Sequence, residues 1–357
     1  MNKIIPFSIG ILSLFTQCKT VAQPLKTATN ATNTAVETDS IAEKMVIYQR
    51  SVGGWAKALD NVKIDYKKPL SEGDRAAVID DANRNDATID NNATSREVRY
   101  LLTAYKKTTN VKYLKSAENG IRYLLEMQYK TGGFPQFYPD TSGYRKHITF
   151  NDNAMINALE VLKNVAEGKK DGELVDKSLV EPAKKAVERG IDCILKLQVR
   201  QNGKLTVWCA QHDLNTFKPT KARAYELPSL SGQETVGILA FLMSMDKPSE
   251  AVKAAIKAGV EWLELNKIKG FKYEDIDAPK EKSGKDRVLI ADANSTIWAR
   301  FYDLDTGKPY FCGRDGVKKA TVAEIENERR VGYAWYGSWA ANLLEKQYPK
   351  WVEKWVK

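Results

Sequence analysis

One short block of sequence recurs four times along this chain, and this repeat limits the fold more than any other feature. Every copy contains a Gln or Asn that is followed, four or five residues later, by a glycine. The four glycines are 79, 71 and 67 residues apart, which leaves room for two helices and their connections in each repeat. The copies are Tyr48–Trp55, Met127–Phe134, Leu197–Gly203 and, more weakly, Leu265–Phe271.

The sequence around the blocks has the period of a helix. Apolar residues before the second and third blocks recur every three or four positions, and the following glycine favours a left-handed helix stop. A second helix is predicted after each glycine loop, starting near Ser95, Ala154 and Gln233. Repeated helical hairpins bury their apolar faces against one another. We therefore predict an all-α fold, an α/α toroid or incomplete (α/α) barrel of repeated helical hairpins, with few short strands such as Lys204–Trp208.

The chain starts in the order of a secretory signal: a charged beginning, an apolar run at Ile4–Phe15 and small residues up to Ala22. The apolar run is shorter than the roughly 20 residues that span a membrane. We predict a signal peptide at residues 1–22 and a secreted protein, periplasmic or extracellular. Cys18 leaves open a lipoprotein signal and a place on an outer surface. Residues 23–40, rich in Thr, Ala and Asn, are expected to be a flexible linker before one folded domain at 41–357.

Cysteine content and net charge limit the kinds of metal site and binding partner that this chain can have. Apart from Cys18, the chain has Cys193, Cys209 and Cys312, so at most one disulfide forms among these three, and no CxxC pair supports a zinc cage. The formal net charge of +10 favours an anionic partner, although a solvated basic surface would give the same count. We expect a monomer with no nucleic-acid partner and no membrane-spanning segment.

Two Asp-Asn pairs lie just before predicted second helices, Asp90-Asn91 in the first repeat and Asp152-Asn153 in the second. In a toroid of equivalent repeats, both carboxylates would lie on the same rim and point into one funnel. Each Asp alone is also a good helix N-cap, which is the structural alternative. Together the oxygen atoms suggest a hard cation, because calcium takes about six to eight oxygen ligands from carboxylates, amides and water.

Two polar segments are further candidates for function. Trp208–Glu234 forms a polar loop before the third repeat's second helix, and Trp298–Trp339 is dense in arginine and aromatic residues. Arginine binds carboxylates through two parallel hydrogen bonds, and aromatic faces stack on sugar rings, so the second segment suits an acidic glycan. The structural alternatives are a solvated connector capped by Ser231, core packing of Trp335 and Trp339, and pairing of Arg329 and Arg330 with Glu326 and Glu328.

The chain has only two histidines, and neither His147 nor His212 falls in a metal-binding motif. A Ser-His-Asp site built on His212 and Asp213 would lack a nucleophile elbow. We expect both histidines to be structural residues or residues of the rim.

Several long motifs occur in one order that resembles the pectate lyases of polysaccharide lyase family 10. The resemblance extends from about residue 41 to the C-terminus and implies that 41–357 is a catalytic domain with a helical toroid and a wide groove. The motifs are Ile89–Thr94, Gly132–Pro139, Ile148–Met155, Trp208–Glu234 and Phe311–Trp339.

The resemblance also implies roles for particular residues. Arg223 matches the family's Brønsted base, and Asp90, Asn91 and Asp152 match its site for calcium and a substrate carboxylate. Asn153 is a departure, because an Asp is expected there in many relatives, and it would leave one negative charge fewer near the cation. The residues implied to bind substrate are Arg300, Arg314 and Arg329, which match arginines that hold galacturonate carboxylates, together with Asn91 and Tyr333.

The reaction that the resemblance implies is calcium-assisted anti-β-elimination on de-esterified polygalacturonate. An arginine side chain ordinarily has a pKa above about 12, so a base of this kind favours activity at high pH. Two alternatives remain open from the sequence. One is a toroidal glycoside hydrolase with Asp90 and Asp152 as paired carboxylates, and the other is a non-catalytic surface protein that binds acidic glycans.

Overall fold

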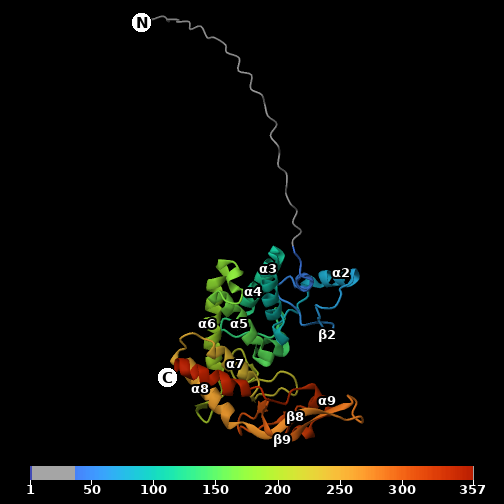
Figure 1. Ribbon diagram of the computed structural model, residues 1–357, viewed down its shortest axis with the longest axis vertical. Coiled ribbons are helices and arrows are strands. Elements are labelled where there is room, and N and C mark those ends of the chain that lie inside the picture. Colours follow the sequence, from blue (N-terminus) through green and yellow to red (C-terminus); the bar gives the residue numbers. More distant parts are fainter. Residues whose placement is uncertain (2–36, 357) are drawn as a thin grey trace. The chain divides into compact units, whose positions relative to one another are not determined.

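The computed structural model describes residue 1 and residues 37–356 of the chain (Figure 1). The predicted signal peptide, Cys18 and most of the predicted linker lie outside the described residues. From residue 37 onward the described residues belong to one compact unit, and its first helix begins at Ser40, one residue before the predicted start of the domain. No helix in residues 37–356 has the length and apolar character needed to cross a membrane.

Helical hairpins form the larger part of the structure, as the repeat predicts. The second helices predicted near Ser95, Ala154 and Gln233 begin at Ser95, Ala154 and Glu234, and each packs against the helix that follows it. The helices in the described part of the chain are α1 (Ser40–Tyr48), α2 (Glu72–Asp80), α3 (Ser95–Thr108), α4 (Val111–Met127), α5 (Ala154–Glu167), α6 (Val180–Leu197), α7 (Glu234–Met243), α8 (Glu250–Leu265), α9 (Asn327–Gly332) and α10 (Tyr348–Trp355), with a π-helical turn η8 (Leu343–Gln347) before α10.

The hairpins are arranged in two layers. Helices α3, α5 and α7 contact one another in sequence order and form one layer, while α1, α4, α6 and α8 form the other. The helices follow the chain from α1 at one end to α8 and the C-terminal helix at the other (Figure 1). This is the predicted α/α toroid in its incomplete form.

The Gln of the repeated block joins each repeat to the next one. The side-chain amide of Gln128 donates to the carbonyl of Gly132 at 3.0 Å and to that of Ala186 in α6 at 2.8 Å. It therefore closes its own turn and fixes the neighbouring helix at the same time. The corresponding bonds of the first and third copies run from Gln49 to Gly53 and Ser116 and from Gln198 to Thr206 and Ala255. Asn266 of the fourth copy donates instead to Trp262, at the end of its own helix.

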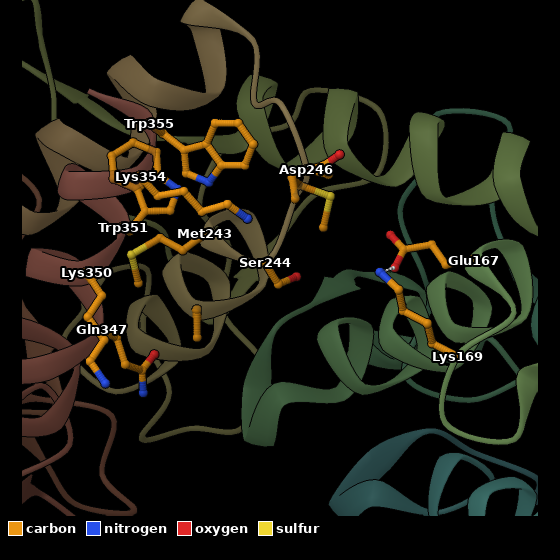
Figure 2. A pocket seen from close by; sticks show the side chains of 12 residues that line it. Glu167, Lys169, Met243, Ser244, Asp246, Gln347, Lys350, Trp351, Lys354 and Trp355 are labelled. Carbon is orange, nitrogen blue, oxygen red and sulfur yellow. Dashed lines mark hydrogen bonds and ion pairs between the residues drawn. The ribbon is translucent and has the colours of Figure 1, made fainter. Parts of the chain in front are cut away.

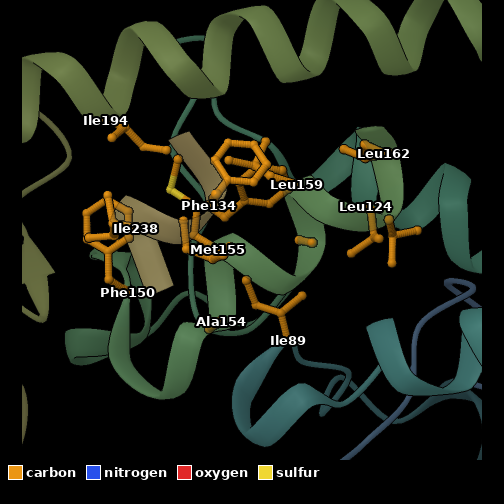
Figure 3. Packing of buried hydrophobic residues seen from close by; sticks show 14 of the residues in the cluster. Ile89, Leu124, Phe134, Phe150, Ala154, Met155, Leu159, Leu162, Ile194 and Ile238 are labelled. Carbon is orange, nitrogen blue, oxygen red and sulfur yellow. The ribbon is translucent and has the colours of Figure 1, made fainter. Parts of the chain in front are cut away.

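An aromatic residue after each turn packs back onto the helix before it. The indole Nε1 of Trp208 donates to the Ile194 carbonyl at 2.8 Å, and Phe134 is the corresponding buried ring of the second repeat. Figure 3 shows Phe134 close to Leu159 of α5, in the core beside α6. Equivalent indole bonds join Trp55 to Met45 at 2.7 Å and Trp298 to Leu263 at 2.8 Å.

The fourth repeat contains a long β-hairpin that the sequence pattern does not predict. The weak block at Leu265–Phe271 leads into β8 (Ile268–Asp277) and β9 (Lys285–Ala299), which separate Leu263 from Trp298. Both faces of the hairpin are partly exposed, so its residues show no clear apolar alternation. The hairpin joins β13 (Tyr336–Gly337) in the order β13-β9-β8.

The remaining strands are short, as expected, and each has two residues. They pair as β1 (Ala58–Leu59) with β2 (Val62–Lys63), β3 (Ile148–Thr149) with β6 (Gln211–His212), β4 (Arg200–Gln201) with β5 (Lys204–Leu205), β7 (Leu230–Ser231) with β10 (Phe301–Tyr302), and β11 (Phe311–Cys312) with β12 (Lys318–Lys319).

A second, smaller hydrophobic core is formed around the C-terminal segment that carries Arg314 and Arg329. It consists mainly of aromatic side chains, including Phe301, Phe311 and Trp335, and is separate from the core of the helical layers. Trp335 is fully buried and donates to the Arg329 carbonyl, which confirms its core packing. The cysteines Cys193, Cys209 and Cys312 are buried free thiols in the structure.

Candidate active site

Two loops with the same backbone conformation bring the predicted cation ligands together. They are η2 (Asp90–Asn92) and η4 (Asn151–Asn153), which contact each other. Positive φ angles of 50° at Asn91 and 64° at Asn92 are matched by 53° at Asp152 and 59° at Asn153. Asn91 is therefore the structural counterpart of Asp152, and the predicted pairing of Asp90 with Asp152 is wrong by one residue.

Neither carboxylate acts as a helix cap. The residues before α3 and α5 are Thr94 and Asn153, and neither makes a side-chain cap hydrogen bond. Capping therefore does not explain Asp90 or Asp152. The third loop does use a cap, because the Ser231 hydroxyl accepts from the Glu234 backbone N–H at 3.3 Å.

The two carboxylates are incompletely neutralised. Asp90 is buried, with Oδ2 paired to Lys57 and Oδ1 without a hydrogen-bond partner in the described residues. Burial raises the pKa of Asp152, and the nearby carboxylates of Glu234 and Asp90 raise it further, while Arg300 opposes them. An oxygen-binding cation would relieve both the unpartnered oxygen and the repulsion.

The protein ligands alone would fill only part of a calcium coordination shell. Within residues 37–356, no cluster of three or more His, Cys, Asp or Glu side chains has the geometry of a metal site. Asp90, Asp152 and the Asn91 amide lie on two contacting loops and offer fewer oxygens than the six to eight that calcium takes, so water and a ligand would have to supply the others.

Arg300 links this carboxylate pair to the arginine-rich segment. Its guanidinium is buried, and Nη2 lies 2.5 Å from Glu234 Oε1, 3.1 Å from Asn151 Oδ1 and 3.4 Å from Asp152 Oδ1. The same guanidinium lies 4.5 Å from the centre of the Tyr333 ring. Its Nε is buried without a hydrogen-bond partner in the part of the chain that the structure describes.

Arg223 is held by a buried carboxylate that the sequence analysis did not single out. Its Nε and Nη2 donate to the two oxygens of Glu226 at 2.7 and 2.5 Å, and the Tyr333 hydroxyl donates to Glu226 at 2.9 Å. Burial acts to lower the pKa of Arg223, but the bonds to Glu226 outweigh it and raise that pKa overall. The side chain of Arg223 remains 44% exposed, so the ion pair faces solvent on one side.

Arg314 and Arg329 both bind Glu328. Arg314 Nη2 lies 2.9 Å and Arg329 Nε 2.7 Å from its carboxylate, and these bonds lower the pKa of Glu328 to about 2. The Arg329 guanidinium is also 4.7 Å from the centre of the Tyr225 ring. Arg223, Arg300 and Arg329 thus lie against Tyr225 or Tyr333. Arg314 is joined to them through Glu328, which it shares with Arg329.

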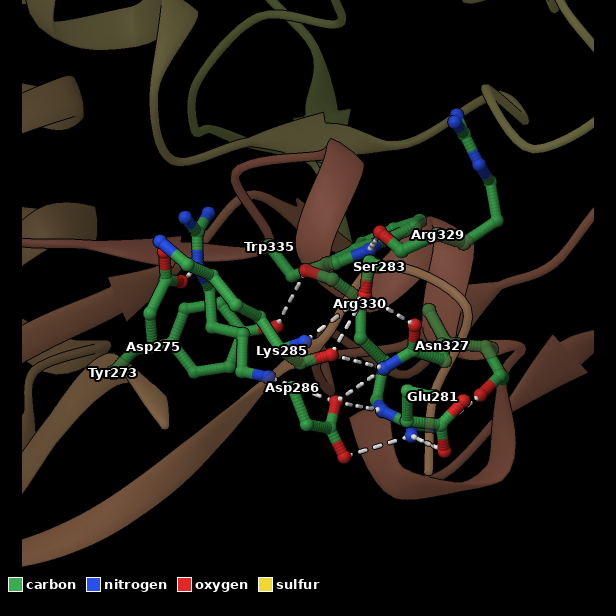
Figure 4. A network of polar contacts seen from close by, with 12 residues as sticks. Tyr273, Asp275, Glu281, Ser283, Lys285, Asp286, Asn327, Arg329, Arg330 and Trp335 are labelled. Atoms are coloured by element: carbon green, nitrogen blue, oxygen red, sulfur yellow. Dashed lines mark hydrogen bonds and ion pairs between the residues drawn. The ribbon is translucent and has the colours of Figure 1, made fainter. Parts of the chain in front are cut away.

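The neighbouring Arg330 has a structural role. Figure 4 shows it bound to Asp286 at the start of β9, while the side chain of Arg329 points away from this network. The Arg330 guanidinium lies 2.7 and 2.8 Å from the Asp286 carboxylate, so the structural alternative of an ion pair with Glu326 or Glu328 is wrong for Arg330.

The two histidines take no part in this arrangement. His212 is fully buried, its Nδ1 lies 2.9 Å from the Phe217 carbonyl, and its Nε2 accepts from the Cys209 backbone at 3.2 Å. Burial lowers the pKa of His212 to about 4, so the ring stays neutral. The prediction that His212 is structural is confirmed.

The residues missed from the sequence are the anionic partners of the arginines and one lysine. Glu226 lies three residues after Arg223, Glu234 starts α7, and Lys57 follows the first repeat block by two residues. Only the short spacing from Arg223 to Glu226 offered a signal in the sequence. The other pairings join distant segments of the chain.

Two cavities differ in their relation to these residues. One of about 570 Å³ is lined by Asn91, Asp152 and Lys57 at the start of the helices. Another of about 760 Å³, shown in Figure 2, lies at the opposite ends of α5 and α7, beside Trp351 and Trp355. The second cavity contains none of the predicted site residues.

An open helical toroid that combines paired carboxylates with an arginine and tyrosine cluster is suited to an enzyme that acts on acidic polysaccharides. The Pectic acid lyase family matches residues 49–344, and the chain belongs to this family. It is therefore a pectate lyase, and the family assignment decides against a glycoside hydrolase and a non-catalytic glycan-binding protein. A comparison with the curated proteins gives no match.

Two solved structures of the family 10 polysaccharide lyase from Cellvibrio cellulosa are similar to this chain over most of its length. A mutant in complex with trigalaturonic acid has 37% identity and a TM-score of 0.76, covering 88% of this chain and 92% of that one. The other structure has 36% identity and a TM-score of 0.74, covering 88% and 91%.

Proposed function

We propose that the enzyme cleaves de-esterified polygalacturonate by calcium-assisted anti-β-elimination, with Arg223 as the base. The observation that carries this proposal is a continuous line of contacts from Asp152 through Arg300, Tyr333 and Glu226 to Arg223. The carboxylate of Asp152 lies at one end of this line, and the partly exposed guanidinium of Arg223 lies at the other. The family 10 structure in complex with trigalaturonic acid supports a substrate of linked galacturonate units.

Two buried polar atoms at the carboxylate end of this line have no hydrogen-bond partner among the described residues. They are Asp90 Oδ1 and Arg300 Nε. A cation beside Asp90, Asn91 and Asp152 would satisfy the first, and a substrate carboxylate that enters the cluster would accept from the second. The exposed Arg314 is free to approach a further carboxylate of the same glycan, because its own ion pair lies in solvent.

The chemistry divides into charge neutralisation and proton transfer. Calcium held by Asp90, Asn91 and Asp152 would withdraw charge from the C6 carboxylate, so that the C5 proton becomes more acidic. Arg223 in its neutral form takes that proton and becomes a guanidinium, the C5–H electrons form the C4=C5 double bond, and O4 leaves with the C4–O4 electrons and takes a proton from water. The hydroxide formed in this way takes the added proton from Arg223 and restores the neutral base. The remaining N–H groups of Arg223 stay on Glu226, which keeps the side chain in place.

The substitution Arg223→Ala tests this assignment. We expect it to abolish the rise in ultraviolet absorbance from polygalacturonate while the circular dichroism spectrum stays that of the folded protein. The melting temperature should fall, because the buried carboxylate of Glu226 loses its ion-pair partner. Arg75→Ala is the matched control, since Arg75 is an exposed arginine of α2 outside the cluster. Turnover near the wild-type rate in Arg223→Ala would remove Arg223 as the base.

Secretion is proposed on the N-terminal segment alone. The order of charged, apolar and small residues in 1–22 supports export to the periplasm or the exterior, with acylation of Cys18 as the alternative. Mass spectrometry of the mature protein separates cleavage after Ala22 from a lipid-modified cysteine.

A further inference from the structure

A second hollow adjoins the candidate site on the side of the first repeat. It measures about 630 Å³, and it shares Lys63 and Arg96 with the 570 Å³ cavity that contains Asn91 and Asp152. Beyond these shared residues it is lined by Lys67, Lys68 and Tyr66, among others. The two hollows therefore meet at a pair of basic side chains, and we call the second one the Arg96 groove.

Arg96 is fixed in position at this junction. Its Nε donates to Glu97 Oε1 at 3.0 Å, and Nη2 binds the same oxygen. Glu97 is fully buried and also accepts from the Tyr66 hydroxyl at 3.0 Å, while the guanidinium lies 5.4 Å from the centre of the Tyr66 ring. The side chain stays partly exposed, and Nη1 has no partner within the described ranges. A rigid arginine with a free nitrogen is well suited to a carboxylate.

The lysines of the groove are available to a ligand. Lys63, Lys67 and Lys68 are exposed, and no carboxylate in residues 37–356 lies within ion-pair distance of any of them. Of the acidic side chains nearby, Asp90 is paired with Lys57 and Glu97 with Arg96. Asp65 also lines the groove and accepts from the Lys67 backbone N–H at 3.0 Å, so one carboxylate there faces three lysines. The groove therefore has a surplus of positive charge next to the candidate site.

We propose that the Arg96 groove is a distal binding site for the carboxylates of a long polygalacturonate chain, which continues from the candidate site across Arg96 toward Lys67 and Lys68. This inference rests on the proposed function. Galacturonate carries one carboxylate per sugar, so a chain that passes Asp152 presents further carboxylates to the neighbouring basic residues. A short oligomer held at the candidate site would gain little from the groove.

The test uses a triple variant, Lys63→Gln, Lys67→Gln and Lys68→Gln. Arg96 itself is left in place, because its loss would leave the buried carboxylate of Glu97 without its partner. The control triple, Lys112→Gln, Lys115→Gln and Lys184→Gln, removes the same charge from exposed and unpaired positions on α4 and α6.

Two measurements separate the groove from catalysis. The first is retardation in gels that contain polygalacturonate and chelator, where turnover is not needed. The groove variant should bind about tenfold more weakly than wild type, as three exposed charge contacts of modest strength would give. The second is the ratio of kcat/KM on polygalacturonate to that on trigalacturonate, which should fall about tenfold through KM.

The outcomes divide clearly. Weaker gel retardation in the groove variant alone, with the lower polymer-to-trimer ratio, supports the distal site. Equal weakening in the control triple, or unchanged retardation in both, overturns it, as does an equal loss of kcat/KM on both substrates. Wild-type protein without any lyase activity would contradict the proposed function, while gel retardation would still decide whether the groove binds polygalacturonate.

Discussion

Glu226 binds Arg223 through both carboxylate oxygens, at 2.7 Å to Nε and 2.5 Å to Nη2, and is itself buried. The same carboxylate accepts the Tyr333 hydroxyl, so the orientation of Arg223 depends on two other side chains. The ion pair with Glu226 affects Arg223 as a base in two opposite ways. It fixes the guanidinium, and it stabilises the protonated form, because a nearby negative charge raises an arginine pKa.

The substitution Glu226→Gln should separate these effects. The amide keeps an acceptor but removes the charge, so the pKa of Arg223 falls and the neutral form becomes accessible at lower pH. We expect kcat to drop about tenfold or more from poorer positioning, with KM less affected, and the alkaline rise of the pH–kcat profile to start at lower pH. A profile that keeps its wild-type position would contradict a role of Glu226 in setting the protonation of Arg223.

The affinity of the site for calcium should fall in acid, because Asp152 takes up a proton. Its pKa is raised in the folded protein, so protons compete with the cation at a higher pH than they would for an ordinary aspartate. The calcium concentration for half-maximal activity should therefore increase as pH falls through this raised pKa. Chelator should stop cleavage, and added calcium should restore it.

The variant Asp152→Asn provides the comparison for this titration. It should need more calcium at every pH and lose most of the pH dependence of the calcium requirement. Activity that persists in excess chelator would reject the cation, and an unchanged pH dependence in Asp152→Asn would assign the effect to another group.

The glycine of the second repeat block should contribute strongly to the stability of the fold. Gly132 has φ 93°, and a Cβ at this position would lie 2.0 Å from the Arg189 carbonyl oxygen in α6. Gly132→Ala therefore combines backbone strain with a clash against helix backbone, and we expect a loss of about 3 kcal/mol or more in the free energy of unfolding.

Gly203 is a natural control, because its φ of 79° is also positive but its Cβ would meet no atom within 4 Å. Gly203→Ala should cost about 1 kcal/mol, from the backbone term alone. Urea unfolding of both variants measures the difference, and equal losses would show that the close approach to α6 contributes nothing.

At the buried aromatic position that follows each turn, a phenylalanine should reduce the stability of the fold less than an alanine. Trp208→Phe loses the indole bond to the Ile194 carbonyl but keeps a buried ring, as Phe134 does in the second repeat. We expect a loss of about 1 to 2 kcal/mol for Trp208→Phe and about 3 to 5 kcal/mol for Trp208→Ala, which leaves a cavity. Similar losses in the two variants, measured by urea unfolding, would contradict this ranking.

The sequence by itself determined the repeat architecture of this pectate lyase. The Gln or Asn and the glycine of each block close one turn at the end of a helix, so their spacing is visible in the chain, although the Gln side chains also bind the next repeat. The helical period placed the starts of α3, α5 and α7 within one residue, because an amphipathic helix shows its buried face in its sequence. The family motifs then indicated which loops carry the chemistry.

Only the tertiary structure decided how those loops meet. The contact of Arg300 with Asn151 joins residues that are 149 positions apart, and no local pattern encodes it. The match of Asn91 with Asp152, the binding of Arg223 by Glu226 and the Arg96 groove likewise depend on how separate repeats pack. Burial and charge at such contacts are set by the surroundings as a whole, which is why residue types alone predicted the members of the site but not their partners.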